Sequence, residues 1–398
     1  SNTRIRREST AKDQAMASAG HAVHQLLSRV ASQKLDNVPM SHPLRVELLE
    51  DAVKAYEGLL ALGDRDPTLR PQLAEALHTI AGLQRELTRN PEAAAALKRS
   101  AAMYESLVPS DPKPPAIRET LAAVEADLAY TWQFDTTSPD RKSFPVEDQY
   151  HRALADYEAI EHDWPGRRQP TTLCLRYLAD FAFRRGDKVM ADQRWSQSIS
   201  RGEAYLQQHP GKFQVQNDLC WACIEYYELL LSRSPDRAKD AEATLAKGVE
   251  QALVMQRESP ESNQVADILA ALHIRQAIVR CRSGEIDEAI PLLDRAIHEI
   301  HVLCEAVPWN TDYWNSAEWF HQIAIRELSD AKRKAELDAF AVQTTDWFKK
   351  VSVKLSDDAL VKQKLQQATA SFAKALRSNG RNEKTEGLLP SEKPLPHN

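Results

Sequence analysis

Apolar residues recur every three or four positions along most of the chain, which is the spacing of an amphipathic helix. Between residues 13 and 34, for example, Met16, Val23 and Leu27 fall on one face of a helix. Strict alternation of apolar and polar residues, which would indicate half-buried strands, is not convincing over any stretch. The pattern therefore predicts an all-α fold.

The helices are predicted to form about seven antiparallel pairs, followed by a capping helix. Helix starts are indicated at Asn90-Pro91, Ser234-Pro235 and Ser259-Pro260, where a capping side chain stands beside a proline that suits the first turn. The expected pairs are 13–34 with 43–62, 67–88 with 91–107, 115–132 with 146–163, 170–184 with 187–208, 212–232 with 236–257, 261–282 with 285–305 and 311–328 with 330–352, and the capping helix is 357–378.

Small residues recur at a spacing of 98 residues, as in Ala81, Ala179 and Ala277, and Gly186 and Gly284 share that spacing. Antiparallel helices approach closely only where side chains are small, and glycine ends a helix by taking the left-handed conformation. Ninety-eight residues are about three units of 33, close to the period of about 34 in the tetratricopeptide (TPR) repeats that these positions resemble. The pairs are therefore expected to stack into a right-handed superhelical solenoid.

The repeat array is predicted to span residues 13–378, between a basic flank at 1–12 and a disordered tail at 379–398. The flank is either a solvated helix start or a basic segment beside an upstream membrane span or domain. The chain starts without Met and without a signal peptide, so we expect it to be part of a longer protein.

The amino-acid composition argues against several classes of function. Only 12 of the 398 residues are glycine, which argues against the phosphate loops of nucleotide enzymes. The 57 acidic residues exceed the 51 basic ones, so we expect no nucleic-acid partner. No run of 18 apolar residues occurs, and no membrane span is predicted in this chain. We expect no cofactor.

Two groups of residues have the spacing of metal ligands. Cys220 and Cys223 form a Cys-x-x-Cys motif, but no second cysteine pair accompanies them, so core packing is favoured over a metal or redox site. His298, His301 and Glu305 fall on one helix face and can also be explained as a mixed polar surface. We therefore predict no metal site, although one at the histidines stays an alternative.

Two further clusters are interpreted structurally. Glu161-His162-Asp163 lie next to one another on a helix and point in different directions, so a solvated helix end is expected. An aromatic cluster is interpreted as a bulky core at the C-terminal end, with a partner-binding patch as the alternative. Its members are Trp309, Tyr313, Trp314, Trp319, Phe320, Trp347 and Phe348.

One stretch resembles a particular family. The segments Leu35–Pro39, Pro43–Arg45 and Glu47–Ala52, followed by Tyr56, resemble the entry to the C-terminal TPR region of large bacterial, planctomycete-type serine/threonine protein kinases. The resemblance is specific over about residues 15–110 and architectural beyond them. It implies a regulatory module that follows a kinase domain, often with a membrane span upstream, and that binds a protein or peptide.

No kinase chemistry is carried over to this chain. The glycines never form Gly-x-Gly-x-x-Gly. His151-Arg152-Ala153 lacks the catalytic Asp, and Asp180-Phe181-Ala182 lacks the Gly of the metal-binding motif. We therefore predict a non-catalytic scaffold, sensor or docking module. The alternatives are an all-α repeat protein with a metal or small-molecule site and an unrecognised enzyme; the sequence does not indicate the localisation.

The resemblance to TPR arrays places the partner on the first helix of each pair, in the concave groove. Arginines there offer forked donors to acidic side chains of a bound segment, or else only satisfy neighbouring acids such as Asp180 and Glu86. The Lys/Asn set that holds a C-terminal carboxylate in chaperone-binding relatives is absent from these positions. The predicted protein-binding residues are His78, Arg85, Arg176, Tyr177, Asp180, Arg184 and Arg275.

Overall fold

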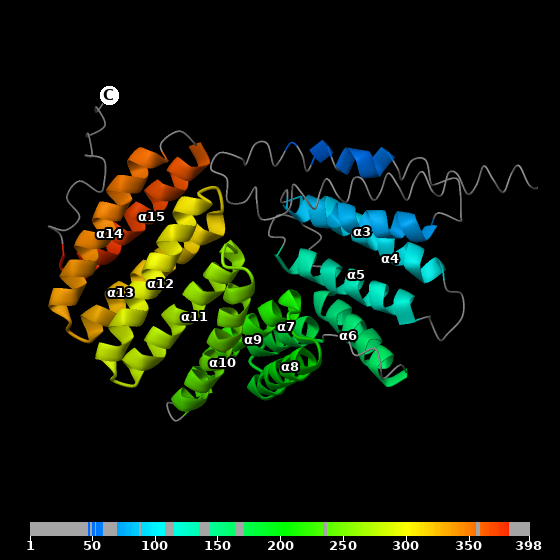
Figure 1. Cartoon of the computed structure of the whole chain (residues 1–398), viewed down its shortest axis with the longest axis horizontal. Helices are drawn as coiled ribbons and strands as arrows, with labels where there is room; N and C mark the ends of the chain where they lie inside the picture. The colour runs from blue at the N-terminus through cyan, green and yellow to red at the C-terminus, as the bar shows by residue number, and fades with distance from the viewer. Residues whose placement is uncertain are drawn as a thin grey trace, which may run out of the picture. The chain divides into compact units, whose positions relative to one another are not determined.

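The computed structural model describes most of the chain from residue 70 to residue 381 and a few residues before it (Figure 1). The described residues are 47, 50–51, 53–58, 70–86, 89–107, 115–134, 144–163, 171–233, 237–355 and 359–381. The predicted basic flank, the helix expected at 13–34, most of the pair partner at 43–62 and nearly all of the tail lie outside them.

Every regular element of the described residues is helical, as the apolar periodicity predicts. The first helices of the pairs are α3 (Arg70–Glu86), α5 (Pro115–Phe134), α7 (Thr172–Arg184), α9 (Phe213–Arg233), α11 (Asn263–Arg282) and α13 (Thr311–Asp330). The second helices are α4 (Asn90–Ser106), α6 (Val146–Asp163), α8 (Lys188–Gln208), α10 (Ala238–Glu258), α12 (Ile286–Ala306) and α14 (Lys334–Lys354), and α15 (Ala359–Ser378) follows. The predicted pairs from residue 67 onward, and the last helix, are thus confirmed with bounds shifted by a few residues.

The repeat of 98 residues is visible in the backbone geometry. Gly186 and Gly284 end α7 and α11 with φ of 83° and 80°, the left-handed conformation expected for them. The Ser100 hydroxyl donates to the Ala74 carbonyl at 2.7 Å, and 98 residues later the Ser198 hydroxyl donates to the Thr172 carbonyl at 2.9 Å. Lys332 takes the glycine position after α13 with φ of 57°, which is unusual for a residue with a side chain.

The chain divides into two compact units, residues 1–218 and 219–398, and the boundary falls within α9. In the first unit, the fully buried Ala81 and Ala93 lie where α3 and α4 meet, and Leu77 and Leu97 fill the space beside them. Small residues at this contact allow the two helices to approach closely. The packing in this unit therefore follows the small-residue pattern of the sequence.

In the second unit an aromatic core closes the C-terminal pairs. Trp314, Phe320 and Phe348 are almost fully buried, and Phe372 of α15 joins them. The Trp314 indole N–H donates to the Pro308 carbonyl at 2.7 Å, which satisfies the polar end of a buried ring. The predicted bulky core is confirmed, although Trp309 and Trp319 are only partly buried.

Gly248 marks a close helix contact in the second unit. A Cβ atom added there would lie 2.8 Å from Cδ2 of Leu272 and 3.2 Å from Cβ of Cys223. These neighbours belong to α11 and α9, so a side chain at this point of α10 would force buried Leu272 and Cys223 to shift. A Cβ added at Gly82 of α3 would meet nothing within 4 Å.

We predict that Gly248→Ala destabilises the chain and that Gly82→Ala stabilises it. Overpacking a closed contact costs about 1–3 kcal/mol, which exceeds the ~0.5–1 kcal/mol that alanine gains over glycine inside a helix. Urea unfolding followed by circular dichroism measures both changes. A Gly248→Ala variant as stable as Gly82→Ala would contradict the close contact.

Candidate functional site

A chain of polar contacts runs along the first helices of unit 1. His78 of α3 lies 2.7 Å from Asp127 of α5, measured from Nε2 to Oδ2. Arg85 donates from Nη1 to Oδ1 of the same carboxylate at 3.1 Å. The Arg85 guanidinium also lies over the Tyr130 ring, 5.5 Å from its centroid. Asp127, which was not among the residues predicted from the sequence, thus joins two that were.

The electrostatics of Asp127 explain how it holds both partners. Burial raises the pKa of this carboxyl, but hydrogen bonds and charge from His78 and Arg85 outweigh burial and lower its pKa below the ordinary value. The carboxylate is therefore ionised at neutral pH and fixes the two side chains on the surface of α3.

Aromatic contacts continue from α5 to α7. Tyr130, 36% exposed, meets the Tyr177 ring edge-on, with centroids 5.8 Å apart. Tyr177 stacks on Tyr150 of α6 at 5.1 Å, and the Arg176 guanidinium lies 4.4 Å from the Tyr177 centroid. Arg176 and Tyr177 are both buried, so they shape this face more than they expose donors to a partner.

Two carboxylates accompany the arginines of α7. Burial raises the pKa of Asp218, and the charge of Arg176 opposes that rise. Asp180 forms an ion pair with Arg184, with 2.8 Å between Oδ2 of the carboxylate and Nη2 of the guanidinium. The Arg184 side chain is 65% exposed. The pairing of Arg184 with Asp180 is one of the two alternatives left by the sequence. Exposed ion pairs contribute little free energy, so Arg184 can exchange this partner at small cost.

A second group of contacts lies in unit 2. Arg275 of α11 stands between two rings, with its guanidinium 5.9 Å from the Tyr227 centroid on α9 and 5.0 Å from the Trp319 centroid on α13. Its Nη1 donates to the Ala271 carbonyl at 2.9 Å, and its buried Nε has no hydrogen-bond partner. Arg275 was predicted from the sequence as a binding residue and Trp319 as a member of an aromatic cluster. Their contact, and that of Arg275 with Tyr227, was not predicted, because it depends on how neighbouring pairs are offset. We call the surfaces of α3, α5 and α7 in unit 1, and of α9, α11 and α13 in unit 2, the first-helix faces.

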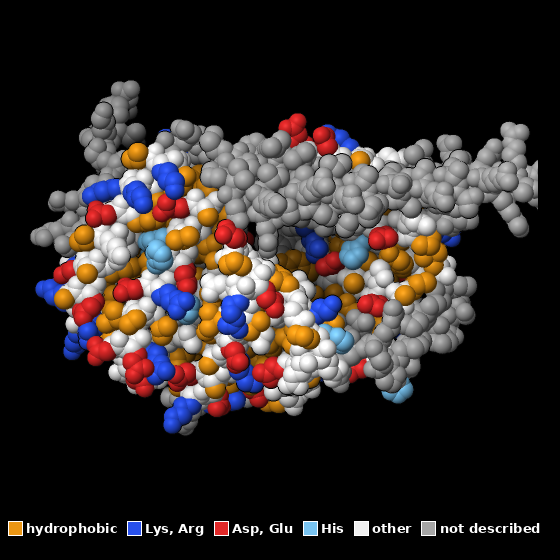
Figure 2. Space-filling view, in the orientation of Figure 1, with side chains coloured by type: hydrophobic (Ala, Val, Ile, Leu, Met, Phe, Trp, Pro, Cys, Tyr) orange, Lys and Arg blue, Asp and Glu red, His pale blue; other side chains and the backbone are white. Residues whose placement is uncertain are grey.

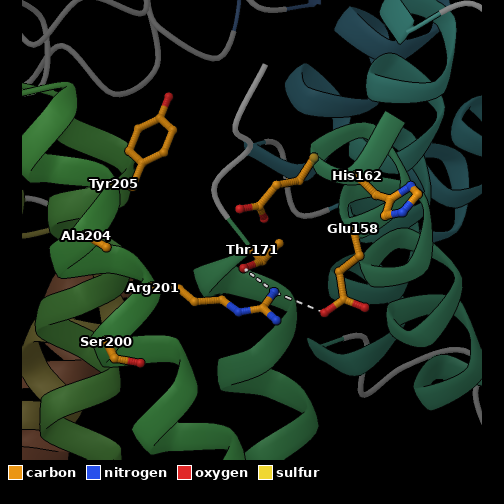
Figure 3. Close-up of a pocket in the computed structure, with 8 residues that line it drawn as sticks. Glu158, His162, Thr171, Ser200, Arg201, Ala204 and Tyr205 are labelled. Carbon is orange, nitrogen blue, oxygen red and sulfur yellow. Dashed lines mark hydrogen bonds and ion pairs between the residues drawn. The ribbon is translucent and has the colours of Figure 1, made fainter. Parts of the chain in front are cut away.

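The structure also contains a cavity of about 470 Å³ between the end of α6 and the second half of α8 (Figure 3). Arg201 reaches from α8 to Glu158 at 3.0 Å and to the Thr171 hydroxyl at 3.4 Å, as Figure 3 shows. The Glu161–Asp163 segment was expected to be a solvated helix end. His162 is indeed exposed, whereas Glu161 is half-buried and lines the cavity.

The three residues of the alternative metal site, His298, His301 and Glu305, lie in different environments. His298 is exposed, whereas His301 is buried, with its Nε2 2.8 Å from Nε2 of His321 on α13. Glu305 instead accepts from the Trp347 indole at 3.0 Å and from Lys354 at 2.9 Å. Among the residues that the structure describes, no three His, Cys, Asp or Glu side chains are grouped to hold a metal ion.

The Cys-x-x-Cys motif lies in the core of unit 2. Cys220 and Cys223 are both fully buried, and the Cys220 thiol lies 3.4 Å from the Gly248 carbonyl, to which it donates. Neither thiol takes part in a disulfide bond. The core-packing interpretation therefore fits these positions.

The buried histidine pair makes the second unit sensitive to acid. Burial, followed by the charges of His321 and His298, lowers the pKa of His301 well below 6.5. Burial lowers the pKa of His321 to about 3. The folded state therefore binds fewer protons than the unfolded state when the pH lies between these values and the ordinary pKa.

We predict full stability above about pH 6.5 and a progressive loss as the pH falls toward 4, by up to about 1.4 kcal/mol per pH unit for each histidine. Thermal melting at pH 7.5, 6 and 5 measures the slope. His321→Phe, which suits the rings of Phe340, Phe348 and Phe372 around it, should make this slope shallower, while the share from buried His301 remains. His298→Gln, at an exposed position, should leave it unchanged. An equal slope in wild type and His321→Phe would contradict the origin assigned to it.

This chain has little sequence similarity to known proteins. No family model and no curated protein sequence matches it. Among solved structures, BtubC (BKLC) from P. vanneervenii is 15% identical, with a TM-score of 0.42 over 64% of this chain and 89% of that one. Yeast Tom70 is 15% identical, with a TM-score of 0.40 over 91% and 66% of the two chains. The S. pombe nuclear import adaptor Nro1 is 14% identical, with a TM-score of 0.38 over 77% and 99%. What this chain binds must therefore be inferred from its own residues.

Proposed function

We propose that the chain is a non-catalytic protein-interaction module whose first-helix faces bind a segment of another protein. The observation that supports this most is the gathering of arginine and aromatic side chains on successive first helices. Two arginine–aromatic contacts are partly exposed. They are the contact of Arg85 with Tyr130 and the contact of Arg275 with Trp319. Tyr, Trp and Arg are the residues that most often dominate binding free energy at protein interfaces.

The charge distribution supports a protein partner over a nucleic acid. On the face shown in Figure 2, acidic and basic side chains of the described residues are interspersed. Non-specific binding of nucleic acid depends on basic side chains that neutralise successive phosphates. Asp127 and Asp180 lie among the arginines of unit 1 and would repel such a backbone.

The cavity favours one alternative, a small-molecule site. It combines the carboxylates of Glu158 and Glu161 with the hydroxyls of Thr171 and Ser200. Arg201 already bonds Glu158 and Thr171, which leaves these groups poorly placed for proton transfer to a substrate. A binding role fits this cavity better than a catalytic one.

The finer proposal is that the module is the regulatory region of a bacterial serine/threonine protein kinase. Its support is the resemblance carried by residues 35–56, of which the structure describes only part. None of the helices in the described ranges combines the length and hydropathy needed to cross a membrane. The coding sequence upstream of Ser1 tests the kinase assignment, because it should encode a Gly-rich loop and a catalytic Asp.

We predict that a photo-crosslinking residue will capture a partner from the first helices and not from the second. Benzoylphenylalanine would replace Tyr130 and Trp319 on first helices, with Val189 and Val353 of α8 and α14 as matched controls that are 65% and 81% exposed. Mass spectrometry of adducts formed in an extract of the source organism would identify the captured protein and the crosslinked residue. Adducts that form at Val189 or Val353, with none at Tyr130 or Trp319, would contradict the proposed surface.

A further inference from the structure

The arginines of the first-helix faces differ in whether the chain itself supplies an acidic partner. Arg85 is paired with Asp127 and Arg184 with Asp180, at 3.1 and 2.8 Å. The positive charge of Arg176 is near enough to Asp218 to oppose the rise that burial causes in the pKa of Asp218. For Arg275, by contrast, the described residues place no carboxylate within ion-pair distance.

The surroundings of Arg275 leave its donors incompletely used. A guanidinium has five N–H groups, and here one nitrogen donates to the Ala271 carbonyl while the buried Nε has no partner. The Tyr227 and Trp319 rings hold the guanidinium plane by cation–π contact. A side chain fixed in this way loses little conformational entropy when it binds, so it is prepared to receive a planar acceptor.

We propose that Arg275, held between Tyr227 and Trp319, binds a carboxylate on an acidic segment of a partner protein. The inference rests on the proposed function, because it assigns a chemical class to whatever binds the first-helix face of unit 2. A carboxylate matches the fork of the guanidinium with two parallel hydrogen bonds. Part of the guanidinium is buried beside the rings, and a charge-assisted pair is stronger where the surroundings are less polar than water.

The more distant charges around Arg275 restrict the kind of acidic partner. Burial lowers the pKa of Arg275 below its ordinary value, and the opposing effects of Tyr227, Glu228, Glu225 and Asp267 offset this only in part. The guanidinium stays charged because the intrinsic pKa of arginine is so high. Those same acids repel any ligand with a dense row of negative charges, such as the phosphates of a nucleic acid. A segment with one or two carboxylates among apolar residues meets less repulsion and also covers Trp319. The chemistry therefore favours a protein segment over RNA.

Selection from a phage-displayed library of random dodecapeptides tests the inference without a known partner. The immobilised full chain would be wild type, Arg275→Gln, Arg275→Lys or Arg257→Gln, the last removing an exposed positive charge from the second helix α10. Wild type and Arg257→Gln should enrich Asp or Glu at a defined peptide position. Arg275→Gln should lose this preference, and Arg275→Lys should keep part of it, since lysine retains the charge but not the fork.

A selected peptide and its Asn/Gln counterpart would then be compared by fluorescence anisotropy. The acidic peptide should bind wild type at least tenfold more tightly than the amide peptide, and Arg275→Gln should remove that difference. Thermal melting checks that the variants fold. If a variant does not fold, the comparison of the acidic and amide peptides on the wild-type chain still tests the same contact.

The outcomes separate this inference from the proposed function. Enriched peptides without an acidic preference, or equal binding of the acidic and amide peptides, overturn the role of Arg275 and leave a binding module. Tight binding of a twelve-nucleotide oligouridylate that is lost in Arg275→Gln also overturns it, in favour of nucleic acid. Failure to enrich any peptide, together with no crosslink from Tyr130 or Trp319, overturns the proposed function itself.

Discussion

The structure depends on how closely two antiparallel helices can approach within each pair. That approach requires residues without bulk at the crossing, and Ala81, Ala179 and Ala277 supply them at intervals of 98 residues, all fully buried. Gly248 extends the same requirement to the contact of α10 with α9 and α11. Because each helix buries its apolar stripe only against its neighbours, a pair that cannot close would also expose the stripe of the next pair.

Close packing has a consequence for the polar residues of the first helices. Side chains such as Asp127, Arg176 and Asp218 lie where neighbouring pairs meet, and burial there destabilises an isolated charge. Unit 1 compensates by placing acids beside bases, so that its first-helix face is electrostatically matched. In unit 2 the compensation at Arg275 comes from two aromatic rings and a carbonyl instead. Rings stabilise a cation without neutralising it, and the charge stays available.

The helices could be predicted from the sequence because their signals are local. The apolar period and the glycines at 186 and 284 fix the bounds of the described pairs to within a few residues. The predicted capping residues were less accurate: α4 begins at Asn90 without a side-chain cap, and α11 begins at Asn263 with Ser262, not Ser259, as its N-cap. The contacts of the candidate site could be predicted only in part. His78, Arg85 and Arg275 were selected from their positions in the repeat, and Trp319 as part of an aromatic cluster. Asp127 was not selected, and the contact of Trp319 with Arg275 was not predicted. Which residue of the next pair faces them is set by the offset between pairs, and no local pattern encodes that offset.

The His301–His321 contact shows the same limit and adds a physical reason for it. His298, His301 and Glu305 share one helical face by spacing, yet the structure turns His301 into the core and Glu305 toward α14. A helix face about 100° wide borders more than one neighbouring helix, so residues on it need not share an environment. Arg275 lies on such a face too, with α9 on one side and α13 on the other. Its value as a recognition residue therefore comes from the two rings that those helices contribute.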